Sequence, residues 1–181
     1  KEGGGDAFVS AGSTGALLSA ATLTVRRVKG IRRAAMAPQI PTKTGREAVL
    51  IDCGATADCT PEFLLQFAFM GSYYAEKVLG IENPRVALLN IGAEDSKGGE
   101  LQKAVYPLLK QAGETGAINF TGNIEARDVP LGGADVVVAD GFSGNILLKG
   151  IEGTALFMAS MMKNMFKKNV LTKLAALLCM D

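Results

Sequence analysis

Five polar loops, each containing glycine and each preceded by an apolar run, constrain this chain more than any other feature. They are residues 10–15, 52–56, 90–95, 121–123 and 140–145. Continuous apolar runs are typical of buried parallel strands, and open α/β sheets bind ligands beyond the carboxyl ends of such strands. Glycine there lets backbone N–H groups approach an anion, and the helix that follows adds the positive end of its dipole. The pattern predicts a site for a small anion, with phosphate as the first candidate.

Strands and helices are expected to alternate along the chain. The expected strands are 7–10, 48–52, 86–91, 118–121 and 135–139, and the expected helices are 15–25, 60–80, 100–112 and 145–169. Such alternation implies right-handed crossovers and a mostly parallel sheet covered on both faces, which is an α/β three-layer, Rossmann-like sandwich. We expect one domain over 1–181, incomplete at both ends, with a C-terminal amphipathic helical segment from about residue 146 to 181.

Composition excludes several kinds of chemistry. Nineteen basic and 18 acidic residues give a net charge of +1, so the electrostatic footprint of a nucleic-acid-binding protein is missing. Histidine is absent, which removes the commonest general base and metal ligand. Aspartates such as Asp52 and Asp140 show no recognisable metal-ligand spacing, so we expect no metal and no cofactor. The three cysteines contain no CxxC pair and are interpreted as reduced packing residues.

Single loop residues leave two interpretations open. The loop Asp140–Asn145 follows one apolar run and opens a helix, which favours a ligand site, while the alternative is a tight turn with Asn145 as the helix cap. The loop Gly12–Gly15 has the same context but is also common as a plain turn. Lys97 is either a phosphate-binding point charge or a solvated lysine. Cys53 is interpreted as a small buried residue, although its loop position also admits a nucleophile.

The arginine cluster and the C-terminal tail each have more than one interpretation. Arg26, Arg27, Arg32 and Arg33 form a basic cluster that is either a solvated face or a dock for an acidic partner. The tail is interleaved with lysines, so no stretch is long and apolar enough to span a membrane. It is instead predicted to form a dimer core, to contact an anionic membrane surface, or both. The predicted membrane contacts are Phe166, Val170, Leu171, Leu174, Leu177 and Leu178.

Several long motifs, in one order along nearly the whole chain, resemble the bacterial phosphate acyltransferase family of phospholipid synthesis. They are residues 6–16, 67–71 through 80–84, 88–92 with Lys97 and Gly98, 122–125, and 134–145. The resemblance implies the fold of phosphotransacetylases and isopropylmalate-type dehydrogenases and a homodimer. It also implies formation of acyl phosphate from acyl-[acyl carrier protein] and inorganic phosphate.

The resemblance also implies roles for single residues. The family's key lysine and asparagine match Lys97 and Asn145, which are the expected catalytic residues. Two positions depart from the family pattern: Thr56 stands where an asparagine is usual, and Gly99 stands where an asparagine often follows Lys-Gly. The residues expected to contact phosphate or substrate are Gly12, Ser13, Thr14, Gly15, Asp52, Thr56, Asn90, Asn123, Asp140, Gly141, Ser143 and Gly144.

The expected reaction is direct attack of a phosphate oxygen on the acyl thioester, with no covalent enzyme intermediate and no need for histidine. The acidic carrier protein is expected to dock on Arg26, Arg27, Arg32 and Arg33. The resemblance places the protein in the cytoplasm, peripherally bound to the inner face of the cell membrane. The alternatives are a phosphotransacetylase that uses coenzyme A, and a non-catalytic domain that binds a carrier protein or a membrane. A dehydrogenase is disfavoured because the ribose-binding fingerprint is absent.

Overall fold

The computed structural model describes residues 5–178. In chain order the elements are α1 (Thr14–Thr24), β1 (Gln39–Pro41), β2 (Glu47–Ile51), α2 (Pro61–Lys77), β3 (Arg85–Asn90), α3 (Glu100–Glu114), β4 (Asn119–Glu125), the 3-10 helix η1 (Ala126–Asp128), β5 (Val136–Val138), α4 (Gly141–Phe166) and α5 (Val170–Leu178). The chain forms two compact units, Lys1–Asn145 and Ile146–Asp181. This boundary falls at the predicted start of the C-terminal helical segment.

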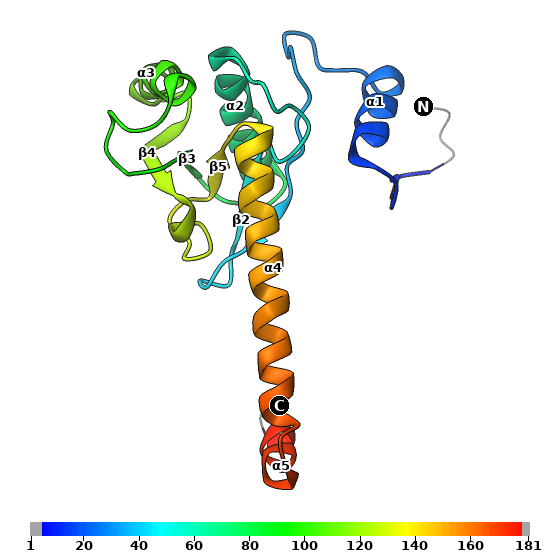
Figure 1. The fold of residues 1–181 in the computed structure, drawn as a ribbon. Helices are drawn as coiled ribbons and strands as arrows, with labels where there is room; N and C mark the ends of the chain where they lie inside the picture. The colour runs from blue at the N-terminus through cyan, green and yellow to red at the C-terminus, as the bar shows by residue number, and fades with distance from the viewer. Residues whose placement is uncertain (1–4, 179–181) are drawn as a thin grey trace. The chain divides into compact units, whose positions relative to one another are not determined.

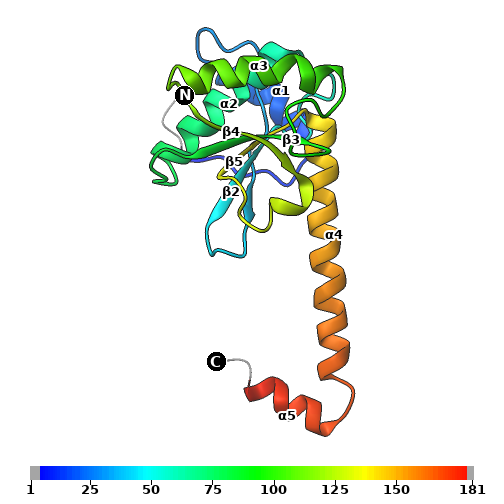
Figure 2. The ribbon, with the colours of Figure 1, turned by 90° about the vertical axis from the view of Figure 1, so that its left-hand side faces the viewer.

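The first unit contains a five-stranded sheet in the order β1-β2-β5-β3-β4. Only β1 is antiparallel to its neighbour, and the pairs β2–β5, β5–β3 and β3–β4 are parallel. Helices α2 and α3 pack against the sheet and against each other (Figures 1 and 2). The α/β class and the mostly parallel sheet are therefore confirmed.

The core lies between these two helices and the central strands. Continuous apolar runs bury Val49, Ile51, Val86, Leu88, Val136 and Val138 against Leu64, Phe67, Val105 and Leu109. Helix α2 begins as predicted, with Pro61 in its first turn after Thr60, where the missing proline N–H costs no hydrogen bond. Its buried residues recur at helical spacing, so one face of the helix covers the sheet. This packing fixes the positions of the loops that follow β2 and β3.

Two predicted strand boundaries were wrong. Residues 7–10 form no strand and are exposed, because a strand needs a neighbouring strand and no described segment pairs with them. Residues 121–123 were predicted to form a loop after a strand, yet they lie inside β4. The register between β3 and β4 shifts at Val86 and Leu88, and Gly122 has a φ of 99° at this irregularity. A bulge accommodates that glycine without ending the strand.

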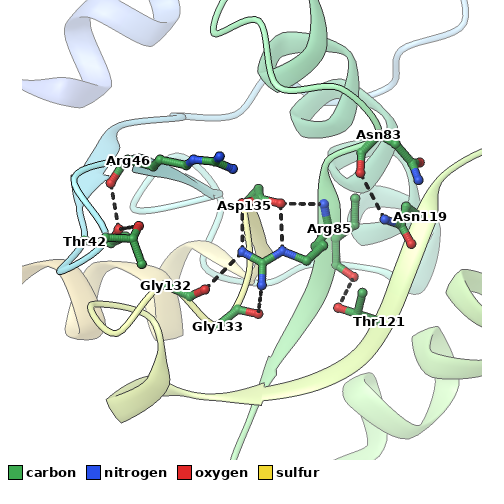
Figure 3. A network of polar contacts seen from close by, with 11 residues as sticks. Thr42, Arg46, Asn83, Arg85, Asn119, Thr121, Gly132, Gly133 and Asp135 are labelled. Atoms are coloured by element: carbon green, nitrogen blue, oxygen red, sulfur yellow. Dashed lines mark hydrogen bonds and ion pairs between the residues drawn. The ribbon is translucent and has the colours of Figure 1, made fainter.

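A charged network closes the amino edge of the sheet, at the start of β3 and just before β5 (Figure 3). Arg85 donates from Nε to Asp135 Oδ2 at 3.0 Å and from Nη2 to Asp135 Oδ1 at 2.9 Å. Its guanidinium also donates to the carbonyl oxygens of Gly132 and Gly133. Burial by itself would raise the pKa of Asp135, but the hydrogen bonds and charge of Arg85 outweigh it, and the pKa is lowered. The ion pair between Arg85 and Asp135 thus joins the start of β3 to the segment before β5.

The helix predicted over 145–169 corresponds to α4, which starts at Gly141 and ends at Phe166, and a separate helix, α5, begins at Val170. Asn169 donates its backbone N–H to Thr172 Oγ1 at 3.0 Å, and Thr172 donates its backbone N–H to Asn169 Oδ1 at 2.9 Å. These reciprocal bonds form a capping box, so Asn169 starts α5 instead of ending α4. The sequence signal was present in Asn169 and Thr172, three residues apart.

Candidate functional site

The loops after β2 and β5 meet at the carboxyl edge of the sheet. The backbone N–H of Gly141 donates to the carbonyl oxygen of Thr56 at 2.8 Å. A Cβ atom at position 144 would lie 1.9 Å from the carbonyl oxygen of Asp52, so only glycine admits this approach of α4 to the β2 loop. The structure thus brings together two of the five predicted loops.

Asp52 organises the first of these loops. Its side chain is fully buried, and Oδ1 accepts the backbone N–H groups of Met36, Cys53 and Ala55 at 2.9, 2.7 and 3.2 Å. Oδ2 accepts the backbone N–H of Thr56 at 2.7 Å. Because both oxygens already accept bonds from the protein, this geometry supports a role in holding the loop. Direct contact of Asp52 with phosphate remains a prediction.

Asp140 caps helix α4, and the alternative cap at Asn145 was wrong. Asp140 Oδ1 accepts the backbone N–H groups of Phe142 and Ser143 at 3.0 and 2.8 Å, and Oδ2 accepts the Ser143 hydroxyl at 2.8 Å. An aspartate at this position satisfies N–H groups that the first turn leaves without partners. The helix therefore starts four residues before Asn145, at Gly141.

Asn145 lies in the second turn of α4, where it faces the β2 loop. A Cβ atom on Gly54 would lie 3.8 Å from Asn145 Oδ1, so the two residues are close neighbours. Since Asp140 performs the capping, the Asn145 amide is available for another purpose. An amide held on a rigid helix beside a glycine loop suits hydrogen bonding to a reacting group.

Lys97 lies in the loop between β3 and α3. Its side chain is about half exposed, and Nζ is 3.9 Å from Glu94 Oε1. Its backbone is tightly held, since its carbonyl oxygen accepts Asn90 Nδ2 at 3.0 Å and its N–H donates to the carbonyl oxygen of Glu94 at 3.0 Å. The loop is fixed while the ammonium group remains accessible, which is the arrangement expected of an anion-binding lysine.

Strands β3 and β4 and helix α3 brace this Lys97 loop, β3 through the bond of Asn90 to the Lys97 carbonyl oxygen. Asn123 on β4 donates from Nδ2 to the carbonyl oxygen of Glu94 at 2.8 Å. Tyr106 on α3 donates its hydroxyl to Asp95 Oδ1 at 2.6 Å, and Lys110 Nζ lies 3.8 Å from Asp95 Oδ2. Burial, followed by the bond to Asp95 and its charge, raises the pKa of Tyr106 to about 12. Asn90 and Asn123, both predicted to contact substrate, here position the loop that carries Lys97.

A cleft of about 490 Å³ opens at this edge. The residues that line it are Ala57, Asp58, Cys59, Glu100, Leu101, Gln102, Asp140, Phe142 and Ser143. The first turns of both α3 and α4 therefore border the cleft, and helix N-termini favour anions. The charged side chains in the lining are all acidic, so a bound anion would need compensating positive charge from residues beside the cleft.

Cys59, in the cleft wall, is a neutral thiol. Its Sγ donates to the carbonyl oxygen of Thr56 at 3.3 Å. Burial raises its pKa to about 11, with a smaller contribution in the same direction from Asp52 and Asp140. A thiol that stays protonated at neutral pH is a poor nucleophile, so Cys59 supports the loop by its hydrogen bond.

Comparisons with known proteins show the family to which the chain belongs. A family model described as a fatty acid synthesis protein matches residues 1–181. The chain belongs to this family. A phosphate acyltransferase from Bacillus cereus (strain B4264) is 54% identical over 176 residues, which are 97% of this chain and 52% of that protein. A phosphate acyltransferase from Bacillus mycoides (strain KBAB4) is 53% identical over the same shares. The chain spans about half the length of these relatives.

A solved structure supports the fold. The EutD phosphotransacetylase from Staphylococcus aureus superposes with a TM-score of 0.54, covering 71% of this chain and 44% of its own, at 19% identity. At this identity the match shows the shared fold, as the sequence predicted.

The predicted phosphate loop at Gly12–Gly15 lies outside the cleft lining. Ser13 Oγ accepts the backbone N–H of Ala16 at 3.3 Å, so Ser13 is the N-cap of α1. Within residues 5–178, no interaction of Gly12, Thr14 or Gly15 with the residues of the cleft is found. A phosphate contact at these four positions stays a prediction.

The predicted docking arginines have different surroundings. Arg27 donates to the carbonyl oxygen of Arg32, and Arg32 Nη1 pairs with Glu62 Oε2 at 2.8 Å. Arg26 has a φ of 72° just after α1. Arg33 instead donates from Nε to Thr56 Oγ1 at 2.8 Å, which ties it to the β2 loop. Among these four arginines, and within the part of the chain that the structure describes, Arg33 alone bonds to the β2 loop, and no local sequence pattern predicts this bond.

The predicted membrane residues belong to the second unit. Val170, Leu171 and Leu174 are exposed on α5, and Phe166 at the end of α4 is half-buried. Leu177 and Leu178 close α5, and their side chains lie outside the described residues. None of the helices described is sufficiently long and apolar to cross a bilayer. Across the same residues, no group of three His, Cys, Asp or Glu side chains is placed to hold a metal ion.

Proposed function

We propose that the complete protein containing this chain transfers an acyl group from acyl-[acyl carrier protein] to inorganic phosphate. The observation that carries the proposal is the cleft at the carboxyl edge, bordered by two helix N-termini, with Lys97 on the loop that leads into α3 and Asn145 in the second turn of α4. The family membership and the phosphate acyltransferase relatives support the same reaction.

The reaction joins a phosphate oxygen to the thioester carbonyl carbon and breaks the carbon–sulfur bond. The products are acyl phosphate and the carrier's thiolate, which takes a proton from water. Lys97 balances the negative charge of phosphate as it approaches, and the Asn145 amide donates a hydrogen bond to the oxyanion that develops on the carbonyl oxygen. Phosphate is already a competent nucleophile at neutral pH, so the protein acts by positioning and electrostatics.

The test is the formation of acyl phosphate by the complete protein from long-chain acyl-carrier protein and phosphate. Lys97→Ala and Asn145→Ala are expected to lower kcat by about 100- to 1,000-fold, as is typical for removal of an oxyanion donor. Lys103→Ala is the matched control, because Lys103 is an exposed lysine in the first turn of α3. Equal loss in all three variants would contradict the assigned roles.

The donor substrate needs its own comparison. Acyl-coenzyme A offered in place of acyl-carrier protein distinguishes the two acyl donors, and preference for coenzyme A would indicate a phosphotransacetylase. If a folded complete protein binds the carrier tightly but forms no acyl phosphate from either donor, the binding-domain alternative replaces the enzyme.

The basic cluster of Arg26, Arg27, Arg32 and Arg33 is our proposed dock for the acidic carrier protein. Opposite charges at an exposed surface raise the association rate, and salt screens them. The rate at low carrier concentration is therefore expected to fall steeply with added salt. A rate that does not change with salt would contradict docking at this cluster.

The second unit is our proposed membrane contact and dimer element. The exposed apolar residues Phe157, Met161, Met165, Leu171 and Leu174 are accompanied by Lys163, Lys167, Lys168 and Lys173, a combination typical of segments that bind anionic membranes. The proposal places the protein at the inner face of the cell membrane, on the cytoplasmic side. Flotation of the complete protein with anionic vesicles, but not with neutral ones, is the expected result. A sedimentation mass equal to one chain would contradict the homodimer.

A further inference from the structure

Arg33 differs from the other arginines of the basic cluster by its fixed position at the site. Its Nε donates to Thr56 Oγ1 at 2.8 Å. Thr56 is only 6% exposed, and its backbone is bonded on both sides, with the N–H to Asp52 Oδ2 at 2.7 Å and the carbonyl oxygen to Gly141 N–H at 2.8 Å. The guanidinium is therefore held against the junction of the β2 loop with α4.

The bond to Thr56 occupies only one edge of the guanidinium. Among the described residues, Nη1 and Nη2 of Arg33 have no hydrogen-bond acceptor, whereas Arg32 already pairs with Glu62 at 2.8 Å. A planar guanidinium with two terminal nitrogens available recognises the oxygens of a phosphate group in bidentate fashion. Arg33 is thus oriented but still has the donors that an anion requires.

The charge of Arg33 also acts at the cleft. It is one of the groups that influence the Cys59 thiol in the cleft wall, where it opposes the increase in pKa caused by burial. Asp58, Glu100 and Asp140 contribute only negative charge to the lining. A phosphate dianion at this edge carries more negative charge than two helix N-termini balance, so Arg33, which is bonded to Thr56 outside the cleft lining, would add positive charge to that of Lys97.

We propose that Arg33 binds a phosphate group at the carboxyl edge of the sheet and that Thr56 is the positioning residue that orients its guanidinium. The inference rests on the proposed function, since that reaction supplies two sources of this chemistry. One is the inorganic phosphate substrate, and the other is the phosphodiester in the prosthetic arm of the carrier. In either case Arg33 acts on a small anion, and Thr56 supplies the acceptor that orients it.

The test compares Arg33→Gln with Arg32→Gln in the complete protein. The KM for phosphate is expected to rise by about tenfold or more in Arg33→Gln, as for loss of a charge-assisted bidentate contact, and to change less than about twofold in Arg32→Gln. Thr56→Val is expected to raise the same KM by a smaller factor, and Thr56→Ser, which keeps the hydroxyl, is expected to restore it. If Thr56 only supported the fold, the difference between Thr56→Val and Thr56→Ser would not be confined to the KM for phosphate.

A second arm separates the two phosphate sources. If Arg33→Gln raises only the KM for acyl-carrier protein, but not that for an acyl-pantetheine thioester without phosphate, the bound group is the phosphodiester of the arm. If Arg33→Gln and Arg32→Gln raise the KM for acyl-carrier protein equally and leave that for phosphate unchanged, both arginines serve docking and the inference is overturned.

A direct measurement of phosphate binding tests the role of Arg33 separately from the proposed reaction. Equilibrium dialysis with radiolabelled inorganic phosphate needs no acyl donor. Weaker binding to Arg33→Gln than to Arg32→Gln supports the inference even if the unmodified protein forms no acyl phosphate, a result that would end the proposed reaction alone. Equal phosphate affinity and unchanged KM values for both substrates in an active enzyme would overturn the role of Arg33 and leave the reaction standing.

Discussion

At the amino edge of the sheet, both carboxylate oxygens of Asp135 accept hydrogen bonds from Arg85, whereas at the carboxyl edge those of Asp52 and Asp140 accept them from backbone N–H groups and, at Asp140 Oδ2, from the Ser143 hydroxyl. All three carboxylates are buried. The difference lies in what remains for a ligand. The charge of an arginine that pairs with a buried carboxylate is neutralised by that pair. A carboxylate that accepts hydrogen bonds from neutral donors does not pair with the nearby cations, so Lys97 and Arg33 can still bind an anion.

The comparison shows how similar buried acids serve different purposes. Arg85 uses its guanidinium on Asp135, Gly132 and Gly133, and so ties the start of β3 to the segment before β5 (Figure 3). Asp52 and Asp140 shape two loops by means of neutral donors, and Lys97 and Arg33 lie on or against the carboxyl-edge loops with donors still accessible. The amino edge thus provides stability, and the carboxyl edge provides a preorganised polar surface.

Among the changes that test this comparison of the two edges, the largest expected effect is the loss of activity in Asp52→Asn. The amide places an NH2 group where one oxygen now accepts an N–H, so a donor would face the backbone donor of Thr56 or those around Oδ1. The loop would shift, and with it the contact from Thr56 to Gly141 at the start of α4. Displacement of a catalytic group by about 1 Å costs on the order of 100-fold in rate, so kcat for acyl phosphate formation is expected to fall by about that factor. Near-normal kcat in a folded Asp52→Asn enzyme would contradict the view that the carboxyl edge of the sheet serves activity while the amino edge serves stability.

The matched change at the opposite edge is Asp135→Asn. It removes an ion pair from a buried position and is expected to lower the free energy of unfolding by about 1–3 kcal/mol, because Arg85 donors lose their partner. The kcat is expected to stay within about twofold, since the site lies at the other end of the strands. Urea unfolding together with kcat under saturating substrates checks both parts. A large loss of kcat at unchanged stability would reverse the assignment of roles.

The pH dependence of stability sharpens the same comparison. The folded-state pKa of Asp135 is lowered, because the hydrogen bonds and charge of Arg85 outweigh the opposing effect of burial. A carboxyl group with a lowered pKa stabilises the fold above its unfolded pKa of about 3.9, and this contribution is lost as the pH falls through the folded value. The difference in unfolding free energy between the unmodified protein and Asp135→Asn should be constant from about pH 7 to 5 and shrink below about pH 4. A difference that grows toward low pH would contradict the mechanism.

The sequence predicted those parts of the fold that depend on local patterns. The apolar runs at β2 and β3 and the Thr60-Pro61 start of α2 each have a physical signature within a few residues, and the structure confirms them within one residue. The strand predicted at 7–10 was wrong because pairing depends on a distant partner. The strand that contains Gly122 was cut short because a glycine that forms a bulge resembles one that ends a strand.

The sequence predicted which loops form the candidate site, but it did not predict the hydrogen bonds between the residues of those loops. Asp140 and Asn145 are both acceptable helix caps in the segment Asp-Gly-Phe-Ser-Gly-Asn, and only the structure shows that Asp140 is used. The bonds from Arg33 to Thr56 and from Tyr106 to Asp95 join residues 23 and 11 positions apart. Contacts between residues so far apart in the sequence leave no local pattern. The hydrogen bonds that support the site could therefore be found only in the structure.

The smallest expected effect concerns Tyr106, which braces the Lys97 loop without touching the cleft. Its pKa is raised to about 12 by burial and by its bond to Asp95, whereas an unfolded tyrosine titrates near 10. Between these values the folded protein binds one more proton than the unfolded chain, so the contribution of Tyr106 to stability is complete below about pH 10 and declines as the pH rises toward 12. Spectrophotometric titration at alkaline pH, compared between the unmodified protein and Tyr106→Phe, isolates this one phenol from the other tyrosines. The difference should titrate near pH 12, and Tyr106→Phe should reduce kcat by only a few-fold, because Asn90 and Asn123 still hold the loop. A difference that titrates near pH 10 would mean that Tyr106 is not bonded to Asp95, and the brace from α3 would be absent from the folded enzyme.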